Sequence, residues 1–173
     1  MEIKAALMKI KAVCFPTDHQ QAKEYYERAL SIQLSKLGPD HVDVASTYHN
    51  MGTLHHHLGD HKQAKEYYER ALTIKLNKLG PDHFDVTCTY HSMGIVHHCL
   101  GDHKKAKEYY ERALSIQLNK LGPEHVAVAR TSRLLGDVQC VLNAQKQLAH
   151  RIIEDRVQFI QPKNHRSNIC NIV

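Results

Sequence analysis

Tryptophan is absent from this 173-residue chain, and only three phenylalanines occur, so tyrosine, leucine and alanine must fill most of the core. No apolar run approaches the roughly 20 residues that span a bilayer. The N-terminus also has no hydrophobic stretch of the kind found in signal peptides. The sequence therefore predicts neither a transmembrane segment nor secretion.

No Cys-x-x-Cys pair occurs among the five cysteines, which are scattered along the chain and odd in number. We interpret them as reduced thiols and expect a cytoplasmic protein. The last four residues begin at Cys170 and resemble a prenylation box, in which Ile172 fits the pattern and Asn171 does not. Cys170 is thus a candidate lipidation site, and the alternatives are an unstructured chain end or a fragment of a longer repeat protein.

Catalytic motifs are missing as well. The sequence has no nucleophile elbow, no phosphate-cradling glycine loop and no paired carboxylates on an irregular loop. The net charge of +5, from 23 basic and 18 acidic residues, mildly favours acidic partners but is far below that of a nucleic-acid binder. We therefore expect a non-catalytic protein with no cofactor and no nucleic-acid partner.

What the chain does contain is a repeat. Residues 38–79 recur at once as residues 80–121, with a period of 42 residues and ten differences. A period of this length with helical punctuation is typical of a stacked-repeat solenoid. Each copy predicts a first helix, as at 43–57, and a second helix, as at 61–79, with a Leu-Gly-Asp turn between them.

Helix start and stop signals punctuate each copy. Asp43 and Asp85 precede the first helices and Asp60 precedes a second helix, where a carboxylate can accept free backbone N–H groups. Gly59 suits the left-handed conformation at a helix C-terminus. A Gly-Pro pair then ends the second helix, which proline cannot continue.

Packing positions identify the motif, because large, small and aromatic residues recur in fixed order along the two helices. They are Tyr48, Met51, Gly52, His55, Ala64, Tyr68 and Ala71, with equivalents 42 residues later. This order resembles the tetratricopeptide repeat. The 42-residue unit and the linker Leu-Gly-Pro-Asp-His are similar to the long repeats of kinesin light chain and nephrocystin-type proteins, over about residues 18–141. The family usually has a proline after the linker histidine, where Val42, Phe84 and Val126 stand here.

The resemblance implies an all-α, right-handed α-solenoid of about four helix-turn-helix repeats at residues 2–160. We divide it into units of about 2–37, 38–79, 80–121 and 122–160, of which the first and last are degenerate, and a flexible tail at 161–173. The first unit begins with an expected helix at 2–14, and Asp18 is expected to cap its second helix. In the last unit we expect a helix at 127–141 and a degenerate partner and cap at 143–160.

The ten differences between the two best copies suggest a binding surface. Four of them, at positions 46, 50, 53 and 57, follow one helical stripe, whereas the packing stripe is unchanged. In tetratricopeptide solenoids the first helices line a concave groove, so the resemblance places the variable stripe where a partner segment would lie. The predicted groove residues are His49, Asn50, Thr53, His56, His57, His91, Ser92, Ile95, His98, Arg130 and Arg133. The alternative is neutral drift on a solvated face.

The chemistry of this groove suggests its ligand. Asn50 matches a family position that commonly holds the backbone of the partner, and Arg130 and Arg133 suit a carboxylate. The sequence therefore predicts a protein-interaction adaptor that binds a peptide of acidic character. One rival is a structural repeat segment that associates with itself through the solenoid ends.

Fifteen histidines raise the other rival, a metal-binding protein. His56 and His98, with Cys99 as a sulfur ligand, are candidate metal ligands, although their spacing matches no zinc signature. A plainer reading takes the groove histidines as polar lining and His55 and His97 as packed aromatics. A third hypothesis is pH-dependent binding of the acidic peptide, tighter at about pH 6 than at pH 8.

Overall fold

The computed structural model describes residues 19–160, and in that range the backbone forms six helices and no strand. The helices are α2 (His19–Leu37), α3 (Val42–His57), α4 (His61–Leu79), α5 (Phe84–Cys99), α6 (His103–Leu121) and α7 (Val126–Ile160). The predicted helix at 2–14, the cap Asp18 and the tail at 161–173 with Cys170 lie outside the described residues. None of the described helices combines the length and apolar character of a membrane span.

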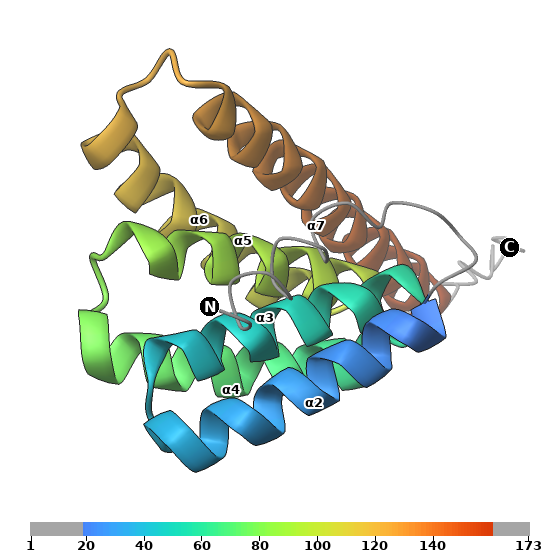
Figure 1. The fold of residues 1–173 in the computed structure, drawn as a ribbon. Helices are drawn as coiled ribbons and strands as arrows, with labels where there is room; N and C mark the ends of the chain where they lie inside the picture. Colours follow the sequence, from blue (N-terminus) through green and yellow to red (C-terminus); the bar gives the residue numbers. More distant parts are fainter. Residues whose placement is uncertain (1–18, 161–173) are drawn as a thin grey trace, which may run out of the picture.

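The helices stack in the order of the chain. Each packs on its sequence neighbours, from α2 on α3 through to α6 on α7. Helix α3 also touches α5, so the first helices of successive pairs are adjacent. The predicted all-α, right-handed α-solenoid is confirmed (Figure 1).

Glycine and aspartate divide each helix pair, as the sequence predicts. Gly59 adopts a φ of 79°, and Asp60 Oδ1 accepts the backbone N–H of Gln63 at 3.2 Å. The same turn recurs at Gly101 and Asp102. A left-handed glycine ends one helix and a carboxylate begins the next, so the chain reverses within three residues.

The caps of the first helices differ from the prediction. Asp43 and Asp85 are not the caps, because His41 Nδ1 accepts the N–H of Asp43 at 3.1 Å and His83 Nδ1 accepts that of Asp85 at 3.2 Å. The aspartates lie in the first turn, where the positive end of the helix dipole favours a carboxylate. His125 makes the same contact at the start of α7, so the first turn of α7 keeps this contact although alanine replaces aspartate there.

Close approach between paired helices depends on a glycine. A Cβ atom on Gly52 would lie 2.7 Å from two ring atoms of Tyr68, and one on Gly94 would lie 2.5 Å from a ring atom of Tyr110. Ala64 is fully buried beside this contact. The predicted packing of a large ring against a small residue is therefore confirmed in both copies.

Helix α7 departs from the prediction. We expected separate helices at 127–141 and 143–160, but α7 is one 35-residue helix, so the prediction of a second helix that folds back is wrong. Asn143 and Ala144 stand where Gly59 and Asp60 break the α3–α4 pair. Without the left-handed glycine and the capping carboxylate, nothing in this segment stops the helix.

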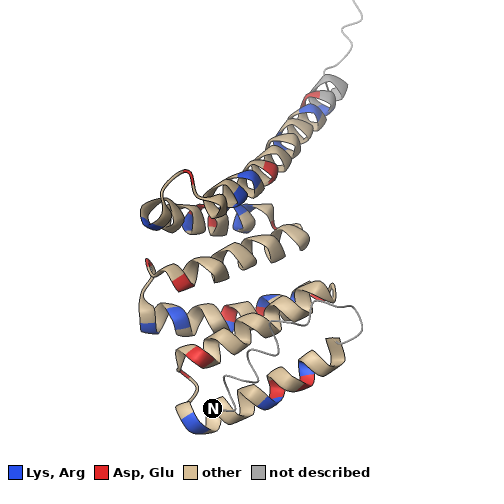
Figure 2. Cartoon of the chain, turned by 45° about the horizontal axis from the view of Figure 1, so that its top comes forward, with Lys and Arg blue, Asp and Glu red and all other residues tan. Residues whose placement is uncertain are grey.

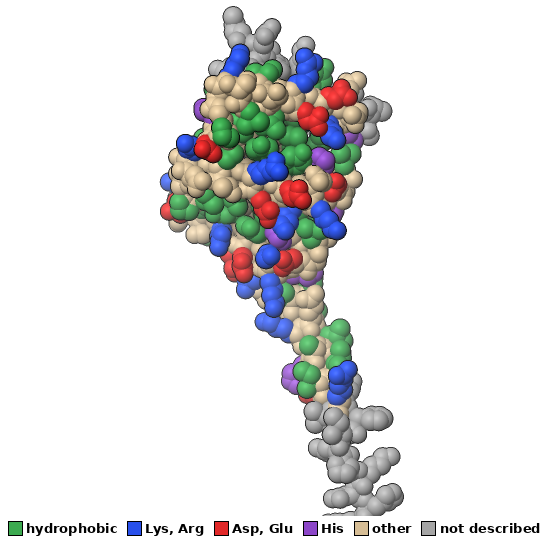
Figure 3. Space-filling view, turned by 90° about the horizontal axis from the view of Figure 1, so that it is seen from below, with side chains coloured by type: hydrophobic (Ala, Val, Ile, Leu, Met, Phe, Trp, Pro, Cys, Tyr) green, Lys and Arg blue, Asp and Glu red, His purple; other side chains and the backbone are tan. Residues whose placement is uncertain are grey.

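The second half of α7 consequently projects from the stack as a single rod (Figure 2). Hydrophobic side chains gather on the projecting part (Figure 3). They include Leu148 and Ile153, each 61% exposed, and Ile152, which is 47% exposed. An apolar face of this kind is what a second helix would have covered.

Candidate peptide-binding groove

The predicted groove residues lie on α3, α5 and the first half of α7. Most are half-buried, namely His49, Asn50, Thr53, His56, His91, Ser92, Ile95 and His98. His57, Arg130 and Arg133 are exposed. The stripe is thus reachable from solvent, but its members differ in how firmly neighbouring side chains hold them.

His49 and His91 are held between repeats. His49 Nδ1 lies 3.3 Å from Thr89 Oγ1, and His91 Nδ1 lies 3.1 Å from Thr131 Oγ1. Both threonines are fully buried. Burial, with a smaller contribution from Lys75, lowers the pKa of His49 to about 4, and burial also lowers the pKa of His91. His49 therefore stays largely neutral near pH 6.5, and both histidines join one repeat to the next.

The pKa of His56 is lowered too, first by burial and then by repulsion from His61 and His57. Three of the predicted groove histidines are therefore less cationic near pH 6 than free histidine is. Tighter binding of an acidic peptide at pH 6 gains no support from these side chains.

A buried polar contact that the sequence reasoning missed lies beside His49. Lys75 is only 6% exposed, and its Nζ donates to Thr89 Oγ1 at 3.2 Å and to the carbonyl of Asp85 at 3.3 Å. Burial is the main cause that lowers the pKa of Lys75. One repeat earlier, Gln33 takes this place and bonds Thr47 at 2.7 Å. Lys75 is one of the ten positions at which the two best copies of the repeat differ, and this difference is the sequence signal that could have identified the contact.

The variable stripe also follows the packing around the tyrosines. The hydroxyl of Tyr68 lies 3.0 Å from Thr53 Oγ1. Burial raises the pKa of Tyr68, although the polar side chains of Thr53 and Ser92 act to lower it. Thr53 and Ser92 therefore belong to a polar setting that serves a buried phenol.

Around Tyr110 the two equivalent side chains are apolar. Ile95 and Leu134 take the places of Thr53 and Ser92, and they pack against the cluster that contains Tyr110. Burial raises the pKa of Tyr110 well above its ordinary value. The residue at position 53 and its equivalent therefore changes together with the residue that the next repeat places beside the same tyrosine. Ligand binding alone does not require such paired variation.

The other histidines of the first helices behave as predicted packed aromatics. The rings of His55 and Tyr67 lie 5.2 Å apart, and those of His97 and Tyr109 lie 5.3 Å apart. Both histidines are buried. They fill the position that is usually aromatic in the repeat, as the plain reading of the sequence expected.

Two candidate metal ligands, His56 and Cys99, come together in the structure, and the third, His98, does not join them. The partner that completes the group is His61, which the sequence reasoning missed because it lies across a turn. His98 pairs instead with His103, with 3.3 Å between their Nδ1 atoms. Both pairs bridge the end of a first helix and the start of a second.

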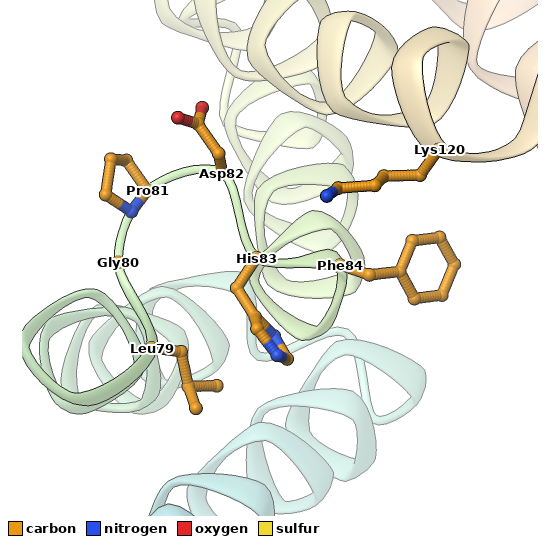
Figure 4. Close-up of a pocket in the computed structure, with 7 residues that line it drawn as sticks. All are labelled: Leu79, Gly80, Pro81, Asp82, His83, Phe84 and Lys120. Atoms are coloured by element: carbon orange, nitrogen blue, oxygen red, sulfur yellow. The ribbon is translucent and has the colours of Figure 1, made fainter.

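A separate hollow of about 480 Å³ lies at the linker between α4 and α5 (Figure 4). It is lined by Leu79, Gly80, Pro81, Asp82, His83, Phe84 and Lys120. The hollow is at the N-terminal end of α5, whereas the variable stripe of α5 ends at Cys99. One cation, one carboxylate and a partly exposed ring define no ligand class, so the hollow receives no functional assignment.

The 42-residue period and the contact between glycine and tyrosine are both typical of one family of helical repeats. The family model of the tetratricopeptide repeat matches residues 17–77 and 78–158. The chain belongs to the tetratricopeptide repeat family. Repeats of this family form protein–protein interaction modules, and the chain is such a module. Proteins of the family are generally non-catalytic.

Solved structures support the predicted resemblance to kinesin light chain-type repeats. BtubC (BKLC) from P. vanneervenii is 25% identical with a TM-score of 0.66, over 90% of this chain and 64% of that chain. A kinesin light chain-like protein of Podosopora anserina with nearly identical TPR-like repeats is 24% identical with a TM-score of 0.65, over 95% and 77%. The Sgt2 TPR domain from Aspergillus fumigatus is 20% identical with a TM-score of 0.63, over 84% and 82%.

These likenesses define the fold and the repeat type. The chain spans about two thirds of the length of the BtubC structure. No curated protein matches the chain significantly.

Proposed function

We propose that the chain is a non-catalytic cytoplasmic adaptor that binds an acidic partner peptide in a concave groove. The groove is formed by α3, α5 and the first half of α7, with Asn50 and Arg130 among its lining residues. Membership of the tetratricopeptide repeat family supports protein binding. The observation that carries the acidic preference is the position of Arg133.

Arg133 stands, by repeat register, where His49 and His91 stand in the two preceding units. Those histidines contact threonines of the following first helix. Within residues 19–160 no further helix follows α7, and Arg133 is exposed. A guanidinium that is free of packing can hold a carboxylate through two parallel hydrogen bonds.

Arg130 strengthens the positive charge at the same end. It stands one turn from Arg133 on α7. The pKa of His91 is lowered mainly by burial and to a smaller extent by the positive charge of Arg130. In the two preceding repeats its place is taken by Ser46 and Cys88. The charge of the proposed groove therefore rises toward α7, and we expect the acidic part of the peptide to bind there.

Fluorescence anisotropy with two labelled peptides of equal length, one glutamate-rich and one serine-rich, tests this proposal. We expect the wild type to favour the glutamate-rich peptide and Arg133→Glu to weaken it by about three- to tenfold. Arg28→Glu is the matched control, because Arg28 is exposed on α2 and the change in net charge is identical. Equal binding of both peptides, or equal loss in both variants, would contradict an acidic groove.

The natural partner is then sought by affinity capture from cell lysate. The wild type is compared with the double variant Asn50→Ala with Arg133→Glu, after both show the same helical content by circular dichroism. Proteins captured by the wild type and lost by the variant identify the ligand of the groove. Identical sets would move the binding surface away from it.

A second candidate is self-association through the exposed end of the solenoid. The uncovered apolar residues Leu148, Ile152 and Ile153 of α7 favour it. Light scattering over a range of concentrations tests it, with Ile152→Glu as the variant that places a charge on this face. A mass that rises with concentration for the wild type and not for Ile152→Glu supports this candidate, and a constant monomer mass removes it.

A further inference from the structure

Three helix ends from two repeats meet at one point. His56 lies one residue before the end of α3, His61 is the first residue of α4, and Cys99 is the last residue of α5. The Nδ1 atoms of the two histidines are 3.3 Å apart. One nitrogen from each ring and the Cys99 sulfur all lie within 4.8 Å of one another. Two imidazoles from one helix pair and a thiol from the next repeat therefore converge.

These distances are close to those of a tetrahedral zinc site. With Zn–N bonds near 2.1 Å and a Zn–S bond near 2.3 Å, two nitrogens lie about 3.4 Å apart and a nitrogen and a sulfur about 3.6 Å apart. The two histidines already meet the first value. Cys99 is exposed, so a rotation of its side chain can bring the sulfur closer by the roughly 1 Å that remains.

Both imidazoles can use a ring nitrogen as a zinc ligand. A bound zinc ion would take one nitrogen from each ring in place of the contact between the two Nδ1 atoms.

We propose that His56, His61 and Cys99 form a zinc-binding site that joins the second and third repeats. Two imidazoles and one thiolate suit zinc and disfavour calcium and magnesium, which require oxygen ligands. Three protein ligands leave the fourth position to water or to a side chain from a bound partner. The site does not depend on the proposed acidic peptide.

The chain contains its own control for this site. One repeat later, His98 and His103 repeat the histidine pair with the same 3.3 Å between Nδ1 atoms. By repeat register, Val141 stands there in place of Cys99. The histidine pair alone is explained by one N–H···N hydrogen bond across the turn, so the cysteine is what separates a ligand set from a helix-end contact.

Reciprocal substitutions in the full-length chain test the proposal with Zn²⁺ as the only ligand. Zinc affinity is measured by competition with a chromophoric chelator. Cobalt spectroscopy then shows whether a thiolate is bound, from a sulfur-to-cobalt charge-transfer band. All proteins carry serine at the other four cysteine positions, so that the band reports on the tested sulfur alone. We expect Cys99→Val to lose the band and to weaken the tightest zinc site by at least about tenfold.

The gain-of-function variant makes the result decisive. Val141→Cys is expected to add a second zinc equivalent and a second cobalt–thiolate band, because it completes the His98–His103 pair. Zinc is expected to raise the melting temperature of the Cys99 protein and to raise that of Cys99→Val less. An unchanged zinc affinity in Cys99→Val, or the lack of a thiolate band in its parent, would overturn the proposal.

The outcome is separable from that of the groove experiment. Cys99→Val alters no arginine of the proposed acidic site, and valine is the residue that the next repeat carries at this place. We expect this variant to bind the glutamate-rich peptide as its parent does. Loss of zinc without loss of peptide then supports the metal site independently.

Discussion

The α3–α4 pair and α7 are built from corresponding stretches of the repeat, yet one folds back and the other stays straight. At the turn, Gly59 and Asp60 correspond to Asn143 and Ala144. The first pair of residues supplies a left-handed terminus and a cap, and the second pair supplies neither. The turn glycine and the capping carboxylate thus accompany the reversal of the chain, and the helix continues where both are replaced.

The packing contacts changed together with the turn. Tyr68 covers Gly52 in the pair, whereas Ile152, its equivalent in register, lies 47% exposed on the projecting rod. A Cβ atom on Gly136, the equivalent glycine of α7, would meet nothing within 4 Å. The end of the stack thus keeps the glycine that admits a partner helix but has lost the aromatic residue that would fill the gap.

Substituting alanine for Gly52 and for Gly136 is expected to give the largest difference in stability between the two regions. Gly52→Ala places a methyl group 2.7 Å from a fully buried ring, and we expect a loss of about 3 kcal/mol in the free energy of unfolding. Gly136→Ala meets open space in a helix, and we expect a gain of about 0.5–1 kcal/mol. Urea denaturation followed by circular dichroism measures both values. Similar effects at both positions would show that the glycine–tyrosine contact does not hold the pair together.

The interior of the stack and its end differ in how their stability depends on pH, because burial lowers the pKa of His49 in the interior. In the folded chain its pKa is about 4, whereas a free histidine titrates near 6.5. The unfolded chain therefore binds more protons between these values, and stability falls as the pH decreases through this window. We expect His49→Gln to remove about 2 kcal/mol of the loss between pH 7 and pH 5.

Other histidines with lowered pKa values contribute to the same slope, so the informative quantity is the difference between wild type and variant. Arg133, which takes the equivalent place at the end of the stack, provides the control. We expect Arg133→Gln to leave the slope unchanged, because an exposed guanidinium keeps its charge in both states. Parallel stability curves for wild type and His49→Gln would contradict the burial of a neutral imidazole.

Local patterns predicted much of the fold. Gly59 and Asp60 identified the turn, and the order of Gly52 and Tyr68 identified the helix pair, because both depend on residues close in sequence. The sequence also indicates that α7 is continuous, since Asn143 replaces the turn glycine. The prediction of two helices is wrong because the amphipathic pattern of 143–160 indicates a helix but does not show where that helix begins.

The contacts between repeats were harder to predict. His49 meets Thr89 across 40 residues, and His61 joins Cys99 from another repeat. Helical periodicity assigns a residue to a face, but it does not show which groups meet when two units stack. Periodicity likewise does not show whether the proposed groove residues contact a partner, and the peptide experiments test that contact.

The smallest effect distinguishes the two buried tyrosines. The hydroxyl of Tyr68 has Thr53 Oγ1 at 3.0 Å. Ile95 and Leu134 take the places of Thr53 and Ser92 beside Tyr110, and their aliphatic side chains offer its hydroxyl no hydrogen-bond partner. We expect Tyr68→Phe to lose about 1 kcal/mol and Tyr110→Phe to change the free energy of unfolding by less than about 0.5 kcal/mol.

A double-mutant cycle sharpens this last contrast, because it isolates the hydroxyl pair from the change in volume. Ile95→Thr supplies Tyr110 with the partner that Tyr68 already has, at the cost of one less apolar contact. We expect the cost of Ile95→Thr to be smaller with tyrosine at position 110 than with phenylalanine, by about 0.5–1 kcal/mol. A coupling energy of zero would show that the paired variation, from Thr53 with Ser92 to Ile95 with Leu134, does not arise from the tyrosine hydroxyl. It would then return position 53 to the set of residues free to serve a ligand.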